Sequence, residues 1–112
     1  MAKEKFGSGA IFIREEGCSI IGSFHDFDYG DAVPYGMAKI DKDVVIEDNV
    51  WLGDQVIVLG GAHIGEGAVI QAGSVVVDHV PKGAVAGGHP AKMFKMRDMD
   101  HYEALKAQGR FF

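Results

Sequence analysis

Histidine is the side chain best suited to proton transfer near neutral pH, and the sequence contains five of them. His25 stands in the segment SFHDF (residues 23–27), directly ahead of a stretch rich in glycine and proline. Asp26 and Asp28 could orient its imidazole ring, although two acids in a solvated loop are more often only polar loop residues. His25 is therefore a candidate general base.

The single cysteine is a weaker candidate for chemistry. Because Cys18 is alone, no disulfide can form within the chain. A lone cysteine is more often a small buried hydrophobic residue than a nucleophile, and we expect this role for Cys18.

The elements that must position these residues are indicated by a repeat of six residues. One series of aliphatic residues with this spacing consists of Ile40, Ile46, Leu52, Val58, Ile64, Ile70 and Val76. A second series of mostly small apolar residues follows four positions later and consists of Val44, Val50, Val56, Ala62, Ala68, Ser74 and Val80. Both series are predicted to point inward.

A period of six with two inward positions fits neither a helix nor a simple strand. It is typical of short strands joined by tight corners, with three strands closing one triangular coil. Small or polar residues fill the intervening triplets at 47–49, 53–55 and 65–67, where glycine and asparagine tolerate positive φ. A stack of so few coils leaves open edges, so self-association is expected.

The pattern divides a single domain, residues 1–112, into three parts. The regular repeat is predicted over 40–81, and a loop excursion over 26–39, where Gly30, Pro34 and Gly36 would break a coil. A short helix is predicted over about 101–108, with Asp100 and Glu103 as a capping box and Gly109 as its stop.

The excursion carries three aromatic side chains that need a partner. Phe27, Tyr29 and Tyr35 could hold a sugar ring or an apolar acceptor, and they could equally pack against a neighbouring chain. The sequence leaves both alternatives open.

Charge and composition exclude several classes of function. The net charge is −5, and only the tail has a basic balance, with five Lys/Arg against three Asp/Glu in 90–112 and six against thirteen in 1–89. The lack of a broad basic surface argues against nucleic acid as a partner. The charged start of the chain lacks a secretory apolar stretch, and no run of residues is long enough to span a membrane. We therefore expect a cytoplasmic protein.

Three motifs resemble the hexapeptide-repeat acyltransferases. They are VWLG at 50–53, IGEGAVIQAGSVV at 64–76 and GGHPAK at 87–92. The resemblance covers residues 40–97 well and 18–39 loosely, and is closest to the galactoside, maltose and xenobiotic O-acetyltransferases. It implies an all-β, left-handed parallel β-helix that forms a homotrimer, with active sites in clefts between adjacent subunits.

The same resemblance implies acetyl-CoA as acyl donor, no metal, and a histidine base, which His25 matches. Trp51 would line the cleft near the base, although it could instead only pack in the subunit interface. The positions of Gly53, Ala72 and Gly73 match those where the family brings its backbone close to the pantetheine arm of coenzyme A.

The basic residues of the C-terminal region match the family's phosphate contacts. Lys92 and Lys95, with Arg97 nearby, would meet the phosphates of the coenzyme. The pair Val77-Asp78 departs from the Thr-Lys usual in relatives, so one phosphate contact is expected to be lost. His89 replaces the usual asparagine of a turn and is expected to be structural.

These features predict an acyltransferase that moves an acetyl group from acetyl-CoA directly to a hydroxyl of a small acceptor, such as a sugar or a xenobiotic. One alternative is a noncatalytic trimeric binding or scaffold protein, which the short N-terminal region favours. A γ-class carbonic anhydrase is less favoured, because His63, His79 and His89 lack the spacing of that zinc site.

Overall fold

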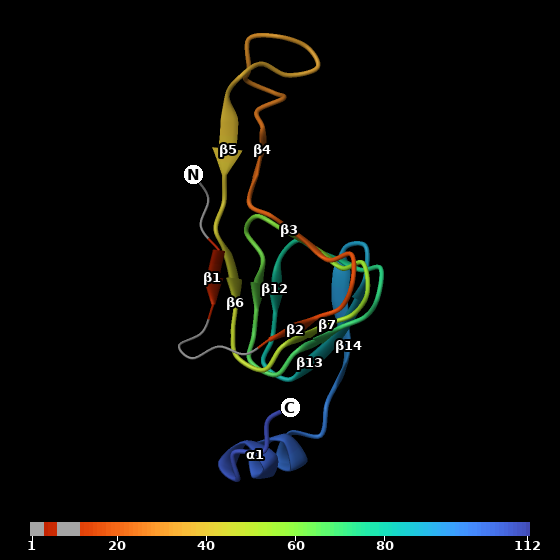
Figure 1. The fold of residues 1–112 in the computed structure, drawn as a ribbon. Coiled ribbons are helices and arrows are strands. Elements are labelled where there is room, and N and C mark those ends of the chain that lie inside the picture. The colour runs from red at the N-terminus through yellow and green to blue at the C-terminus, as the bar shows by residue number, and fades with distance from the viewer. Residues whose placement is uncertain (1–3, 7–11) are drawn as a thin grey trace.

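The computed structural model describes residues 4–6 and 12–112 and shows a parallel β-helix with a projecting arm and a C-terminal helix (Figure 1). The first residues of the chain, 1–3, and residues 7–11 lie outside the described part. The expected fold class, a parallel β-helix with a short C-terminal α-helix, is confirmed. Its left-handed winding stays a prediction from the family resemblance.

Short strands stack coil upon coil, and equivalent strands of successive coils pair in parallel. The first coil contains β1 (Glu4–Phe6), β2 (Ile13–Arg14) and β3 (Ser19–Ile21). The second contains β6 (Val44–Ile46), β7 (Trp51–Leu52) and β8 (Ile57–Leu59), and the third β9 (His63–Ile64), β10 (Val69–Ile70) and β11 (Val75–Val76). The last contains β12 (His79–Val80) and β13 (Ala84–Gly88), on which β14 (Ala91–Met96) folds back antiparallel.

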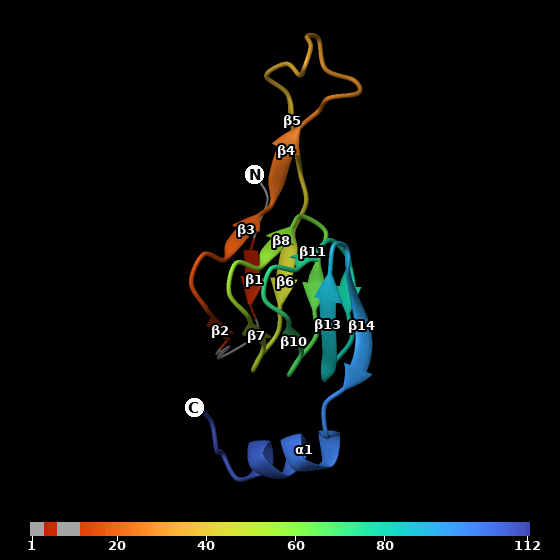
Figure 2. The ribbon, with the colours of Figure 1, turned by 90° about the vertical axis from the view of Figure 1, so that its right-hand side faces the viewer.

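Three walls enclose the coils, and Figure 2 shows them from the side. Their strand orders are β1-β6-β9-β12, β14-β13-β10-β7-β2 and β11-β8-β3. We call the second wall, formed by β2, β7, β10, β13 and β14, the groove sheet. Its strands run side by side across all the coils, so a ligand lying along the coil axis would contact each of them in turn.

Buried side chains fill the coils at the predicted inward positions. All are at most 3% exposed, and they are Val44, Ile46, Val50, Leu52, Val56, Val58, Ala62, Ile64, Ala68, Ile70, Ser74, Val76 and Val80. The hydroxyl of Ser74 accepts the backbone N–H of Gly88 at 3.0 Å, which satisfies this polar group inside the core. Both inward series are confirmed from residue 44 onward.

The prediction for Ile40 is wrong. Ile40 is only half-buried and lies in β5 (Lys39–Asp41), which pairs antiparallel with β4 (Ser23–His25) outside the coils. The regular repeat therefore begins at Val44. An extended strand also alternates its side chains, so a single aliphatic residue in the right phase could not separate the two structures.

The structure adds a coil that the sequence pattern did not reveal. Phe12, Cys18 and Ile20 of the first coil pack against the core as partly buried residues. Cys18 is thus half-buried, and its thiol donates to the carbonyl oxygen of Gly53 at 3.1 Å. Arg14 pairs in register with the inward Leu52 but is exposed, because it lies at the open end of the stack.

Two corners adopt the positive φ values that the sequence predicts, with φ 62° at Asn49 and φ 73° at Gly67. At 53–55 the positive φ, 55°, falls on Gln55 and not on Gly53. The backbone N–H of Gly67 donates to the carbonyl of Asp48 one coil away at 2.9 Å, so the corners stack by the same hydrogen bonding as the strands.

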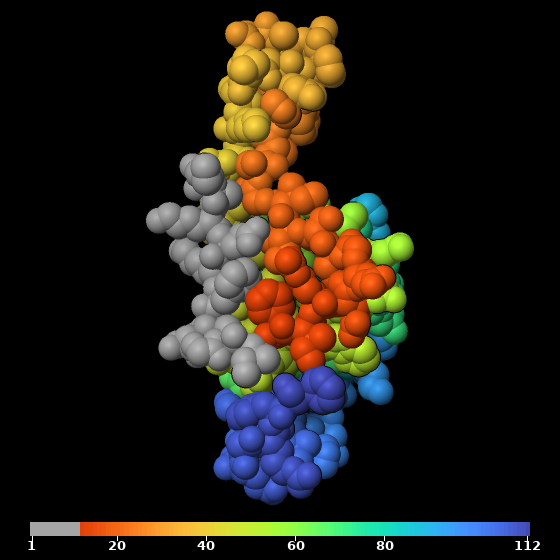
Figure 3. Space-filling view, viewed as in Figure 1, coloured from red at the N-terminus to blue at the C-terminus, as the bar shows by residue number. Residues whose placement is uncertain are grey.

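The excursion forms an arm that leaves the β-helix between the first and the second coil. Its stem is the β4–β5 pair, and its loop at 26–38 stands clear of the coils (Figure 3). Phe27, Tyr29, Val33 and Met37 are exposed on it by 64% or more. The aromatic side chains of the loop thus have much of their surface free for a partner.

The C-terminal helix α1 (Met99–Ala107) begins two residues earlier than predicted. Its N-cap is Asp98, whose carboxylate accepts the backbone N–H of His101 at 3.0 Å. The predicted capping box of Asp100 and Glu103 is therefore wrong, and Glu103 instead forms an ion pair with Lys82 at 3.0 Å. The helix stops before Gly109, which has φ 67°.

A polar network fixes α1 on the corner of the coils. Tyr102 is 8% exposed and packs on Gly67, where an added Cβ would lie 2.9 Å from its ring. The hydroxyl of Tyr102 donates to Glu66 at 2.8 Å and accepts from Asn49 at 3.1 Å. Lys106 also donates to Glu66, at 2.6 Å.

Helix docking is expected to weaken in acid through Glu66. Burial raises the pKa of this carboxyl group, but hydrogen bonds from Lys106 and Tyr102 and nearby positive charge outweigh it, so the pKa lies below its ordinary 4.5. The stabilisation is complete above pH 4.5 and is lost as the pH falls through the lowered pKa. Glu66→Gln should cost about 1–2 kcal/mol at pH 7 by urea unfolding, and much less at pH 3.

The matched control is Glu103→Gln, which removes an exposed ion pair from the same helix. It should change stability by less than about 1 kcal/mol at either pH. An equal cost of Glu66→Gln at pH 7 and pH 3 would contradict the proposed role of the charge.

Candidate active site

A groove of about 710 Å³ lies on the outer face of the groove sheet. Its lining residues come from four neighbouring strands of the groove sheet, β2, β7, β10 and β13, and from the corners after them. They are Glu15, Trp51, Gly53, Asp54, Val69, Ile70, Gln71, Ala72 and Val85. Three of the predicted coenzyme contacts, Trp51, Gly53 and Ala72, are therefore brought together by the fold.

Trp51 faces outward, as the repeat register predicts, and its side chain is 49% exposed. It stands between Ile13 and Val69 on the neighbouring strands. Its indole Nε1 donates to the carboxylate of Glu15 at 3.3 Å, which restrains the ring at one end of the groove. A restrained aromatic face is suited to contact an acyl or pantetheine chain.

The close stacking of the coils leaves no room for a side chain at position 53, which glycine occupies. A Cβ at this position would lie 2.7 Å from the backbone nitrogen of Ala72 in the next coil. Ala72 itself is exposed and lines the groove, whereas Gly73 turns the corner with φ 74° and does not line it. Of these three residues, Ala72 is the one best placed to leave room for a ligand.

The predicted phosphate contacts lie on β14, at the far edge of the groove sheet. Lys95 pairs with Val85, which lines the groove, and Lys92 pairs with Gly87. Both lysines are exposed. Three strand spacings of about 4.8 Å, roughly 14 Å in all, separate β14 from the strand of Trp51. A long, linear ligand could therefore reach from the indole to the lysines.

Arg97 does not join these lysines. Its guanidinium donates to the carbonyl of Gly67 at 2.9 Å and lies 4.9 Å from the ring centre of Tyr102. These contacts hold it between α1 and the coils, so the expectation that Arg97 meets the coenzyme phosphates is not supported by its position.

The ring of His25 is held by two contacts within the arm. Its Nδ1 lies 3.2 Å from the carbonyl oxygen of Gly36, and the ring stacks on Tyr35 at 3.7 Å between centres and 20° between planes. A carbonyl oxygen can only accept, so Nδ1 must carry the proton of the neutral ring. Nε2 is then left with a lone pair, as a general base requires.

The neighbouring carboxylate does not orient this histidine. Asp26 accepts the backbone N–H of Tyr29 at 2.9 Å and so shapes the start of the loop. Backbone and aromatic contacts hold the imidazole in place of the carboxylate that the sequence suggested.

His25 lies apart from the groove within one chain. It does not line the groove, and its arm leaves the coils between β3 and β6, neither of which belongs to the groove sheet. The fold thus brings together the groove residues but not the groove and the candidate base.

Three polar residues of the groove were missed by the sequence analysis. Asp54 and Gln71 follow inward residues of the repeat, and Gln71 lies within the motif at 64–76, so their positions could have been predicted. Glu15 belongs to the irregular first coil and carried no comparable signal.

The remaining histidines lie elsewhere. His63 contacts Glu47 and packs edge-on against His79, with 5.4 Å between ring centres. His89 follows β13 in the turn that leads to β14. Within residues 4–6 and 12–112, no three His, Cys, Asp or Glu side chains are grouped so that they could hold a metal ion.

Comparison with known proteins identifies the class of the coils. Residues 43–78 match the family model described as bacterial transferase hexapeptide (six repeats), and this segment therefore carries that family's repeat. The predicted resemblance to hexapeptide-repeat acyltransferases is confirmed. A special closeness to galactoside, maltose or xenobiotic O-acetyltransferases is not confirmed.

Curated relatives match over about half of the chain. A 2,3,4,5-tetrahydropyridine-2,6-dicarboxylate N-acetyltransferase of Clostridium perfringens is 50% identical over 54 residues, which are 48% of this chain and 23% of the relative. The enzyme of the same name from Staphylococcus aureus is 46% identical over 52 residues, which are 46% of this chain and 22% of the relative. The matched segment thus spans about a quarter of these relatives.

Solved structures share the fold over most of the chain. AntD, an N-acyltransferase from Bacillus cereus in complex with dTDP and coenzyme A, has a TM-score of 0.74 at 16% identity, covering 97% of this chain and 60% of that one. A hexapeptide-repeat acetyltransferase of Vibrio cholerae, complexed with acetyl-CoA, has a TM-score of 0.62 at 29% identity, covering 83% and 53%. At such low identity the first likeness concerns the fold alone.

In the described part of this chain, no helix has the length and apolar character needed to cross a membrane.

Proposed function

We propose that this protein is a coenzyme A-dependent acyltransferase that moves an acetyl group to a small acceptor, with His25 as general base. The observation that carries the proposal is the ring of His25, whose Nδ1 faces the carbonyl of Gly36 at 3.2 Å and whose Nε2 is thereby kept as a proton acceptor. The groove beside Trp51 supports it by offering a place for the donor.

The reaction needs no covalent enzyme intermediate. Nε2 of His25 takes a proton from the acceptor while the acceptor atom attacks the thioester carbonyl carbon. The carbon–sulfur bond then breaks, and the imidazolium returns its proton to the sulfur of coenzyme A. The protein's contribution is proximity of the two substrates and a positioned imidazole that accepts the proton.

The donor is proposed to lie along the groove sheet. The pantetheine arm would pass Trp51 and Ala72, and the phosphates would meet Lys92 and Lys95 on β14. In this position the thioester end lies beside the indole. The nucleotide end lies in residues 90–112, which carry five Lys/Arg against three Asp/Glu.

The complete site is proposed to form between subunits of a homotrimer. His25 and the groove are apart in one chain, and the exposed aromatic side chains of the arm have room for a neighbour. The arm of one subunit would bring His25 to the groove of the next.

The acceptor atom is proposed to be an amine nitrogen rather than the hydroxyl expected from the sequence. The relatives and the AntD structure are all named as N-acyl- or N-acetyltransferases. A base such as His25 serves either acceptor, because both lose a proton during the transfer. The choice therefore rests on the relatives and not on the base.

The test is the release of free thiol from acetyl-CoA in the presence of small amines, amino sugars and hydroxylated acceptors. Turnover with amines above that with matched alcohols would support the proposal in full. Turnover with alcohols alone would overturn the choice of acceptor atom. If acetyl-CoA neither bound nor reacted with any acceptor, the chain would be a noncatalytic binding or scaffold protein.

The positions of Lys92 and Lys95 lead to a specific expectation for the donor. Replacing both with glutamine should weaken the binding of coenzyme A by about tenfold or more, because charge-assisted hydrogen bonds to the phosphates are lost. The binding of pantetheine, which lacks those phosphates, should be unchanged. Calorimetry with both ligands checks this, and Lys82→Gln serves as a control, since it removes a surface lysine that lies outside β14 and does not line the groove.

A further inference from the structure

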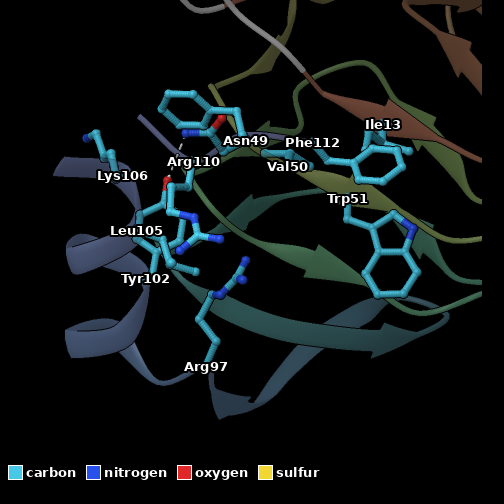
Figure 4. A pocket seen from close by; sticks show the side chains of 11 residues that line it. Ile13, Asn49, Val50, Trp51, Arg97, Tyr102, Leu105, Lys106, Arg110 and Phe112 are labelled. Atoms are coloured by element: carbon cyan, nitrogen blue, oxygen red, sulfur yellow. Dashed lines mark hydrogen bonds between the residues drawn. The ribbon is translucent and has the colours of Figure 1, made fainter. Parts of the chain in front are cut away.

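Trp51 separates the groove from a second cavity, which lies between α1 and the coils (Figure 4). This cavity has a volume of about 240 Å³. Its apolar walls include Trp51, Val50 and Leu105. We call it the helix cavity, and none of the contacts proposed above for acetyl-CoA except Trp51 lies in it.

The charge of the helix cavity is opposite to that of the protein. Arg97, Lys106 and Arg110 line it, and no aspartate or glutamate does, whereas the whole chain has a net charge of −5. In Figure 4 these three side chains lie toward α1, while Trp51 lies on the opposite side. The cavity therefore has a cationic side and an apolar side.

The three cationic side chains differ in how many of their donor groups already have a partner. Lys106 donates to Glu66 at 2.6 Å, and Arg97 uses one of its nitrogen atoms on the carbonyl of Gly67. Arg110 forms no ion pair with any residue that the structure describes. A guanidinium with free donors beside an apolar wall is suited to hold a carboxylate in a bidentate manner.

We infer that the helix cavity binds a small organic anion, in which a carboxylate is attached to an apolar body. The carboxylate would meet Arg110 and the free nitrogen atoms of Arg97, and the apolar body would pack against Trp51 and Leu105. The volume suits a ligand smaller than a typical drug-sized molecule. The inference does not depend on the proposed acyl transfer.

The sole tryptophan of the chain provides a direct signal for this binding. Fluorescence of Trp51 is titrated with 4-phenylbutyrate and, separately, with 4-phenylbutanamide, its uncharged counterpart. The acid is expected to give a saturable change, and the amide should bind at least about tenfold more weakly, because it cannot form charge-assisted hydrogen bonds with the guanidinium groups.

Variants separate the helix cavity from the groove, since Trp51 borders both. Arg110→Gln should weaken the acid about tenfold and leave the amide unchanged. Leu105→Phe, which fills the cavity without changing its charge, should weaken both ligands. Ala72→Phe, which fills only the groove, should leave both affinities unchanged.

The inference would be overturned by the absence of a saturable signal with the acid, by equal affinity for the acid and the amide, or by an Arg110→Gln variant that binds the acid like the native chain. Weakening by Ala72→Phe with no effect of Leu105→Phe would place the ligand in the groove and would overturn it as well.

Discussion

Replacing His25 with alanine is expected to lower the turnover of acetyl-CoA by a factor of about 10² to 10⁴, because a positioned general base contributes that much to proton transfer. His25 lies in the arm and not among the groove residues, so the affinity for coenzyme A should be unchanged. Thiol release and calorimetry on the same preparations check both parts.

The matched control is His101→Ala, which removes an exposed histidine of α1. It should retain native turnover. A His25→Ala variant with native turnover would overturn the assignment of the base. A variant that also failed to bind coenzyme A would indicate that the arm shapes the groove rather than carrying out the proton transfer.

Mixing two inactive variants tests whether the site is shared between chains. His25→Ala lacks the base, and Ala72→Phe blocks the groove. If each site takes His25 from one subunit and its groove from the next, random mixing of equal amounts should restore about a quarter of the native turnover. A site formed within one chain would give no recovery.

Replacing Gly53 with alanine is expected to lower the free energy of unfolding by about 1–3 kcal/mol or more, because overpacking forces backbone shifts. The added Cβ would lie 2.7 Å from the backbone nitrogen and 3.1 Å from the Cα of Ala72. These atoms belong to the adjacent coil, which would have to move away. Urea unfolding of the native chain and the variant measures the effect.

Gly73→Asn is the comparison for this effect. Gly73 has no atom within 4 Å of an added Cβ, and asparagine tolerates the φ of 74° better than most residues. We expect it to cost less than about 1 kcal/mol. If Gly53→Ala were as mild as Gly73→Asn while weakening coenzyme A, Gly53 would be small for the ligand's sake and not for the stacking of the coils.

The core of the coils could be predicted from the sequence because each hexad repeats the same burial. The first coil could not, since its inward register contains Arg14 and Cys18 rather than a regular aliphatic series. The start of α1 was misplaced because Asp98 and Asp100 are both acceptable caps by residue type. Only the hydrogen bond to His101 distinguishes them.

The residues of the candidate site likewise divide into those that could be predicted from the sequence and those that could not. Trp51 and Ala72 could be predicted because they occupy fixed positions of the repeat. The contacts of His25 with Tyr35 and Gly36 could not, because a loop without periodicity gives no register. Nor could the cationic helix cavity, which depends on how α1 packs against the coils.

Because of its stem, the loop of the arm can vary independently of the coils. The chain leaves and returns through one antiparallel pair, in which Ser23 faces Asp41 and His25 faces Lys39. Because these strands fix the two ends of the loop, residues 26–38 can be lengthened or shortened without shifting the register of the coils. Under the proposed function, a change in the loop would alter the acceptor that is recognised and leave the proposed donor groove as it is.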